Sequence, residues 1–327
     1  MKLIQSFLFV LLLILLSCVK TKKIVHDNVF RYNESSSITS LDPLFSNTQS
    51  NIWATNQIFN TLVQLDSNMV IQPLIAKEWF IENEGYKYIF ILRDDVYYHK
   101  SECFGVDSTR KVIAQDFVYS LSRLANRELV SPGRWVLDYF NIDNVVALND
   151  TVLEINLPTP FPGFLGLLTM NYFSFVPKEA VDFFGDKFSS NPIGTGPFYF
   201  KKWKQSEKLI LLKNSNYFEF EKDIRLPYLD GVSISFITQK ESVFMNFILG
   251  NFDFISGLDN SFRDELINVE GELYKSYKNR FSILSTPYLN TEYLGVHLPK
   301  VVNENSPLMY RDFRKALNAC FNKSIMV

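Results

Sequence analysis

The chain has 327 residues and a mass of 38.0 kDa, which is too long for one compact module and predicts about two domains. Hydrophobic residues make up 47% and charged residues 21%, so the chain can bury a sizeable core, and global disorder is excluded. Lys+Arg 33 nearly balance Asp+Glu 35, and the resulting net charge of −2 argues against bulk nucleic-acid binding.

The amino terminus has the pattern of an export signal. Lys2 precedes an apolar run from Leu3 to Leu16, which is too short for a comfortable membrane span. The segment that ends in Ser17-Cys18 resembles a bacterial lipobox, in which Cys18 is lipidated and becomes the first mature residue. We therefore expect a lipid-anchored protein on the periplasmic or cell-surface side of the cytoplasmic or outer membrane. The alternative is an ordinary signal peptide in which Cys18 is incidental.

The remaining cysteines give no disulfide framework. Cys103 and Cys320 are far apart in the sequence, and two thiols do not define a pattern of bridges. We expect Cys320 to be buried.

Beyond a short polar tether at residues 20–28, segments typical of strands and of short helices alternate without any repeat, which predicts a mixed α/β fold. Dense β-branched and aromatic residues predict strands at Tyr88–Arg93 and Leu209–Lys213, and strict alternation predicts another at Val232–Phe236. The apolar stretch Phe161–Val176 is interrupted by Pro and Gly, so a wall of loop and helix is expected there.

Three helices are also predicted. Asp116 is expected to cap a helix with Phe117 and Leu121 on one face, and a helix from Lys240 to Leu249 stops before Gly250. In the last one, Asp312 is expected to cap a helix with an apolar stripe, formed by Phe313, Ala316, Leu317, Cys320 and Phe321. That stripe needs a partner to cover it.

Catalytic chemistry is poorly represented. His26, His99 and His297 have no i, i+4 partner, so a helical zinc site is not expected. The segment Gly194–Phe198 (G-T-G-P-F) lacks the glycine spacing of a dinucleotide fold and predicts a turn. The neighbouring carboxylates Asp94 and Asp95 are expected to be solvated. We therefore expect no enzyme activity, no catalytic residue, no cofactor and no metal site.

Several segments, in order along the chain, resemble the family 5 extracellular solute-binding proteins, which are oligopeptide, dipeptide and nickel receptors of ABC importers. These segments are Ser40–Pro43, Ile58–Leu62, Pro73–Trp79, Tyr88–Val96, Gln115–Leu124, Val176–Ala180, Asn191–Tyr199, Gly250–Ile255 and Arg311–Asn318. Each match is weak by itself, but their order and spacing extend over nearly the whole mature chain.

The resemblance implies an α/β fold of the periplasmic-binding-protein type II class, with two lobes, an extra inserted domain (cluster C type) and an incomplete second lobe. Its lobes would close by hinge bending around an extended peptide that is bound through its main chain. The implied division is a lipoprotein signal peptide at 1–17, tether and start of lobe I at 18–52, an inserted small domain at 53–185, the rest of lobe I at 186–281, and the start of lobe II at 282–327.

The sequence departs from the family pattern in three places. Ser37-Ile38 stands where the family often has Glu-Pro, which puts a carboxylate contact near the ligand in doubt. A longer segment, Lys100–Ala114, replaces a short link and is expected to be a surface loop. The chain ends at Val327, inside the opening helix of the second lobe, so we expect an incomplete lobe with exposed apolar surface.

The leading hypothesis is a monomeric substrate-binding lipoprotein that captures peptides between its lobes and delivers them to an ABC permease. The alternative is a truncated, non-transporting surface lipoprotein of the same family, and a secreted hydrolase is a third hypothesis. The expected ligand contacts are Tyr288, Asn290 and Tyr293, with Ser37 opposite them. Strand packing and loop hydrogen bonds are the alternative roles of these residues. The sequence favours peptides but does not identify the ligand as an oligopeptide, a dipeptide, nickel or another solute.

Overall fold

The computed structural model describes residues 28–285, 293–298 and 306–322. The chain divides into two units, Met1–Phe262 and Arg263–Val327, which are considered separately. Within the described residues, no helix combines the length and the apolar character needed to cross a membrane.

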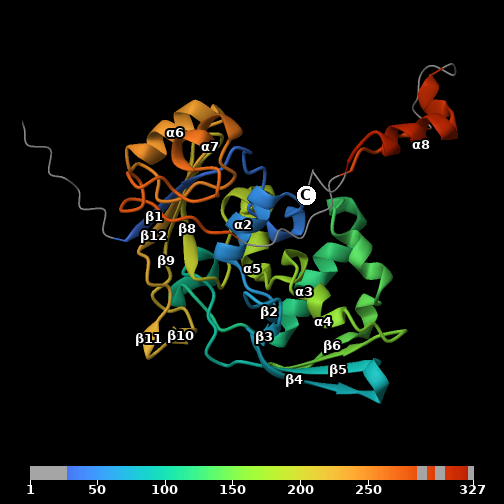
Figure 1. The fold of residues 1–327 in the computed structure, drawn as a ribbon. Helices are drawn as coiled ribbons and strands as arrows, with labels where there is room; N and C mark the ends of the chain where they lie inside the picture. The colour runs from blue at the N-terminus through green and yellow to red at the C-terminus, as the bar shows by residue number, and fades with distance from the viewer. Residues whose placement is uncertain (1–27, 286–292, 299–305, 323–327) are drawn as a thin grey trace, which may run out of the picture. The chain divides into compact units, whose positions relative to one another are not determined.

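The first unit contains a four-stranded sheet built from segments that are far apart in sequence. Its order is β1 (Val29–Asn33), β12 (Gly231–Ser235), β9 (Lys208–Lys213) and β8 (Phe198–Lys204) (Figure 1). β1 runs parallel to β12, whereas the β12–β9 and β9–β8 pairs are antiparallel. Alternate residues of these strands point into one core, where they meet helix α2 (Gln49–Ile58).

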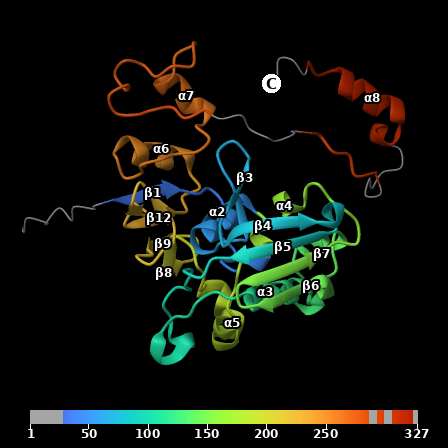
Figure 2. The same cartoon turned by 90° about the horizontal axis from the view of Figure 1, so that it is seen from below.

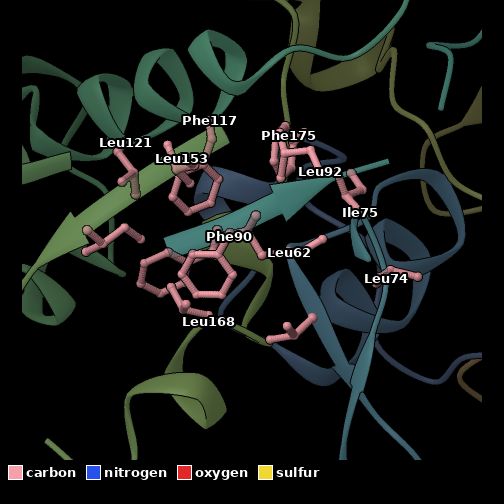
Figure 3. Close-up of a cluster of buried hydrophobic side chains, with 14 of the residues drawn as sticks. Leu62, Leu74, Ile75, Phe90, Leu92, Phe117, Leu121, Leu153, Leu168 and Phe175 are labelled. Carbon is pink, nitrogen blue, oxygen red and sulfur yellow. The ribbon is translucent and has the colours of Figure 1, made fainter. Parts of the chain in front are cut away.

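A second sheet is fully antiparallel, in the order β4 (Ala76–Glu82), β5 (Lys87–Leu92), β7 (Val152–Asn156) and β6 (Val145–Asn149) (Figure 2). Helix α3 (Ala114–Ala125) packs on this sheet. Figure 3 shows Phe90 of β5 and Phe117 of α3 in the core between them. Every second residue of β5 is buried, which is the pattern of a strand with one face covered by other elements.

Shorter elements connect and flank the two sheets. They are β2 (Val63–Leu65), β3 (Ile71–Pro73), α4 (Phe164–Leu167), α5 (Lys178–Phe184), β10 (Phe220–Glu221), β11 (Ile224–Arg225), α6 (Lys240–Ile248), α7 (Asn260–Leu266) and, in the second unit, α8 (Arg311–Ala319). The predicted domain boundaries at residues 53, 186 and 282 stay a prediction.

The predicted strands are confirmed at β5, β9 and β12, each within one residue at either end. The predicted helix before Gly250 is confirmed as α6, and Gly250 has the positive φ of +77° that suits a residue after a helix. The predicted surface loop at Lys100–Ala114 is confirmed in its middle, with a fully exposed Val106, but Val112 is buried and Ala114 is the buried first residue of α3. The wall of loop and helix at Phe161–Val176 is also confirmed, around α4.

Both predicted helix caps are wrong in position. α3 begins at Ala114, so Asp116 is its third residue, and its Oδ2 accepts a hydrogen bond from the Ile113 amide at 3.0 Å. The carboxylate lies in the first turn and reaches back to the amide of the cap residue Ile113, instead of occupying the cap position itself. Asp312 is the second residue of α8, which has Tyr310 at its cap position.

The prediction that Cys320 is buried is also wrong, since its side chain is exposed. Phe313 is 41% and Phe321 50% exposed. Within the described part of the second unit, nothing covers this apolar stripe, so the amphipathic pattern correctly predicted the helix but not the burial of its face.

Candidate functional site at the carboxyl edge of the first sheet

Three chain segments end at one edge of the first sheet. β1 and β12 run parallel, and Phe254 forms a parallel bridge with Tyr32 of β1. Their carboxyl ends therefore lie at the same edge, with the connections that follow them. In open α/β sheets, ligands bind outside the carboxyl ends of the strands.

A pocket of about 370 Å³ lies at this edge, within the size range of small-ligand sites. Its walls come from the chain after β1, the chain after β12, the segment after Phe254, and helices α2 and α6. The lining residues are Asn33, Glu34, Ser35, Gln49, Trp53, Ile237, Thr238, Lys240, Val243, Phe244, Ile255, Ser256, Gly257, Leu258, Asp259 and Phe262.

Asn33, the last residue of β1, holds two walls of the pocket together. Its Nδ2 donates a hydrogen bond to the Ile237 carbonyl at 2.9 Å, and the Ile237 amide donates to its Oδ1 at 2.8 Å. The amide of Glu34 donates to the carbonyl of Ser235 at 2.9 Å. These bonds fix the chain after β1 against the chain after β12, which gives the pocket a rigid base.

Of the charged side chains that line the pocket, two form an ion pair with each other and the third does not. Lys240 forms an ion pair with Asp259. Asp259 also accepts hydrogen bonds from the amide and the hydroxyl of Ser261, at 2.9 and 2.6 Å, and the bonds from Lys240 and Ser261 lower the pKa of its carboxyl. Glu34 is half-buried, and burial raises the pKa of its carboxyl. No ion pair joins Glu34 to another residue in the described part of the chain.

Aromatic side chains supply the apolar wall. Trp53 comes from α2, and Phe244 of α6 stacks on Phe262 with ring centroids 4.4 Å apart and planes inclined by 11°. Aromatic faces of this kind bind aliphatic and cationic groups. The combination of apolar walls, exposed backbone and one unpaired carboxylate suits ligand binding.

A larger pocket, of about 620 Å³, lies elsewhere in the first unit, but its buried polar groups bond to one another. Asn60 Nδ2 donates to the Tyr217 hydroxyl at 3.2 Å, and that hydroxyl donates to Glu219 Oε2 at 2.7 Å. Gln64 Nε2 donates to Glu219 Oε1 at 3.0 Å. This network stabilises the fold and leaves fewer free donors and acceptors for a ligand. We therefore favour the smaller pocket as the candidate ligand site.

Ser37 lies at the same edge of the sheet but does not line the pocket. It is exposed, and its Oγ donates to Ser206 Oγ in the β8–β9 turn at 3.3 Å. Tyr293 is 84% exposed in the second unit, whereas Tyr288, Asn290 and Cys18, the residue predicted to be lipidated, lie outside the described residues. The role of these residues as ligand contacts stays a prediction.

Sequence reasoning missed Asn33, Glu34 and Trp53. Asn33 is the last residue of β1 and Glu34 follows it. Polar residues at the carboxyl end of a strand indicate the edge of a sheet at which ligands bind. Trp53 carries no such signal, because its approach to the pocket depends on how α2 packs against the sheet.

Residues 70–327 match the profile of the bacterial extracellular solute-binding proteins, family 5. The chain belongs to this family. The oligopeptide-binding protein OppA of Salmonella typhimurium is 28% identical over 315 residues, which cover 90% of this chain and 53% of OppA. The murein peptide-binding protein MppA of Escherichia coli is 26% identical over 306 residues, which cover 88% of this chain and 51% of MppA.

A solved structure, the periplasmic binding protein DppA from Helicobacter pylori in complex with the peptide STSA, superposes with a TM-score of 0.66 at 26% identity. The match covers 74% of this chain and 49% of DppA. The predicted fold class of type II periplasmic binding proteins is confirmed by this neighbour. Family 5 consists of substrate-binding proteins and not of enzymes. The chain spans about half the length of the curated relatives it matches.

Proposed function

We propose that this family 5 chain captures peptides and delivers them to the permease of an ABC importer. The observation that carries the proposal is the pocket at the carboxyl edge of the first sheet, in a chain whose relatives are named as oligopeptide-binding and murein peptide-binding proteins. The related DppA structure contains a bound peptide.

The chain after β1 offers a surface for the peptide backbone. Ser35, Ser36 and Ser37 are exposed and continue from the end of β1. An extended peptide that pairs with backbone amides and carbonyls gains affinity without requiring particular side chains. Tyr288, Asn290 and Tyr293 are our proposed contacts from the rest of the chain. In this role the protein holds its ligand and does not alter it.

We also propose that Cys18 is lipidated and tethers the receptor, as a monomer, outside the cytoplasmic membrane. Metabolic labelling with a radioactive fatty acid should mark the wild-type chain and not the Cys18→Ser variant. Equal labelling of both would contradict lipidation at this residue. Labelling of neither, together with a mature chain that is secreted free, would support an ordinary signal peptide.

Peptide binding is tested by titration calorimetry of the purified chain with tripeptides and tetrapeptides. We expect saturable binding, and Trp53→Ala should weaken it about tenfold, because an aromatic wall of the pocket is lost. Trp135→Ala is the matched control, since Trp135 is 46% exposed and does not line the pocket. A folded chain that binds no peptide would contradict the proposal and favour the non-transporting surface lipoprotein.

A further inference from the structure

The charges in the pocket do not cancel. Glu34, Lys240 and Asp259 are its charged lining residues, and Lys240 is already paired with Asp259. Glu34 is left as one uncompensated negative charge in a half-buried position. Removing a carboxylate from water without giving it a partner costs free energy, so a ligand that brings a positive charge recovers that cost.

The cationic residues of β1 and of the pocket lining are already paired. Arg31, on the same strand, makes a bidentate pair with Asp253, with Arg31 Nη2 2.7 Å from Asp253 Oδ1 and Arg31 Nε 3.0 Å from Asp253 Oδ2. Lys240 of α6 is paired with Asp259. The Glu34 charge also acts on the buried hydroxyl of Tyr32, whose pKa is raised by burial and by that charge. Protein groups in the described residues therefore leave the carboxylate available.

The walls next to this carboxylate fit a particular kind of cation. Trp53, Val243 and Phe244 line the same pocket with apolar surface. Lysine and arginine side chains combine an aliphatic stem, which packs on apolar surface, with a charged end that forms charge-assisted hydrogen bonds. The aromatic face of Trp53 adds attraction for the same charge.

We propose that this pocket receives a lysine or arginine side chain of the bound peptide, with Glu34 as the residue that selects the cation. The inference rests on the proposed peptide-binding function and specifies its ligand class. It also places a carboxylate at this edge of the sheet three residues before Ser37, which stands where the family often has a Glu.

The test compares peptides that differ only in charge. The purified full chain is titrated with the tripeptides Lys-Ala-Ala, Ala-Lys-Ala and Ala-Ala-Lys, and with the same peptides carrying norleucine in place of lysine. Norleucine keeps the aliphatic stem and lacks the ammonium group. We expect at least one lysine peptide to bind about tenfold more tightly than its norleucine counterpart, as for a charge-assisted hydrogen bond in a partly buried site.

The variant Glu34→Gln should abolish this preference while the norleucine peptides keep their affinity within about twofold. Glu241→Gln is the control, because Glu241 is exposed on the first turn of α6, does not line the pocket and carries the same charge. It should leave the preference unchanged. Unchanged thermal midpoints of both variants would confirm that they fold.

Each outcome separates the two proposals. Equal affinity for lysine and norleucine peptides, or a preference that survives Glu34→Gln, would overturn the inference and leave peptide binding intact. A preference lost equally in Glu241→Gln would show a general field effect and also overturn it. If neither peptide series binds to the folded chain, the proposed function fails, and the inference fails with it.

Discussion

Gly194 and Gly196 in the G-T-G-P-F segment lie against the backbone of the Ile58–Leu62 segment. The Gly196 amide donates to the Ile58 carbonyl at 2.7 Å, and a Cβ on Gly194 would lie only 2.1 Å from that oxygen. Between the two glycines, Thr195 is buried and donates to Asn60 Oδ1 at 2.9 Å. The motif therefore joins two distant segments by close backbone packing.

Gly194→Ala should destabilise the first unit by roughly 2 to 4 kcal/mol, because the backbone of Ile58 cannot move away without breaking its hydrogen bond. Gly166→Ala is the control, since Gly166 is exposed in α4 and nothing lies near its added Cβ. That change should leave stability unchanged or raise it by up to about 1 kcal/mol. Urea unfolding measures both, and equal effects would contradict the packing argument.

His99 makes the stability of the first unit depend on pH. It is buried, the Gly194 amide donates to its Nδ1 at 3.4 Å, and its Nε2 donates to the Gly196 carbonyl at 2.9 Å. Burial lowers the pKa of His99 from 6.5 to about 4. Between these values the unfolded chain binds more protons than the folded chain, so the free energy of unfolding rises with pH across this window.

Acidification from pH 7 to pH 4 should therefore remove on the order of 3 kcal/mol of stability through His99. Urea unfolding of the wild type and of His99→Gln at several pH values isolates this contribution. The difference in free energy of unfolding between the wild type and His99→Gln should change between pH 4 and pH 6.5 and stay constant at higher pH. A difference independent of pH would show that His99 titrates normally in the fold.

Asp42 of the L-D-P segment and Arg123 of α3 form a buried ion pair. Arg123 Nη2 lies 2.6 Å from Asp42 Oδ2, and the two side chains are 10% and 4% exposed, respectively. Asp42 Oδ1 also accepts a hydrogen bond from the Leu44 amide at 3.0 Å, which caps the short 3-10 helix Pro43–Phe45. A buried pair of this kind fixes the position of the chain more than it raises total stability.

Asp42→Asn should cost about 3 to 5 kcal/mol, because it leaves the Arg123 charge buried without a counter-charge while keeping an acceptor for Leu44. Asp182→Asn is the control, since Asp182 pairs with Lys178 on the exposed surface of α5 and its loss should have little effect. Thermal and urea unfolding measure both variants. A mild effect of Asp42→Asn would mean that Arg123 finds water or another partner.

At the scale of elements, Arg110 connects a surface loop to two helices. Its guanidinium makes two hydrogen bonds of 2.8 Å to Asp116 in the first turn of α3 and two of 2.7 Å to Glu179 in the first turn of α5. The hydrogen bonds from Arg110 lower the pKa of the Glu179 carboxyl. One side chain thus satisfies carboxylates at the amino ends of two helices and holds the loop to both.

Arg110→Gln should destabilise the fold by roughly 1 to 3 kcal/mol, mainly through Asp116, because Glu179 is more exposed and its charge is better screened. The loop should also open, so tryptic cleavage at the exposed residues Lys100 and Lys111 should accelerate. Arg93→Gln is the control, because it breaks a pair with the half-exposed Asp95. Equal cleavage of the two variants would show that Arg110 does not hold the loop.

At the scale of the whole molecule, both hydrophobic cores belong to the first unit. Among the described residues, every buried residue of the two cores lies between Tyr32 and Phe236. A fragment of residues 28–262 should therefore unfold cooperatively, with a thermal midpoint within a few degrees of that of the full chain. Calorimetry of both measures this. A fragment without a cooperative transition would show that residues 263–327 are needed for folding.

The sequence predicted local structure where the pattern depends on a few neighbouring residues. The alternation at Val232–Phe236 predicted β12, and Gly250 marked the end of α6, because side-chain period and backbone freedom are local properties. The caps at Asp116 and Asp312 were misplaced, since a carboxylate satisfies a free amide from more than one position in the first turn. The burial of Cys320 depends on packing partners, which no local pattern contains.

Ordered motifs and side-chain periodicity were enough to predict the family, the mixed α/β class and most of the regular elements. The pocket that Asn33 and Glu34 share with Trp53, Lys240 and Asp259 is visible only in the folded chain. The parallel pairing of β1 and β12 brings those residues together across most of the chain. This arrangement depends on which strands pair with each other. The free energy that favours the pairing comes from packing throughout both cores, so no single segment of the sequence reveals it.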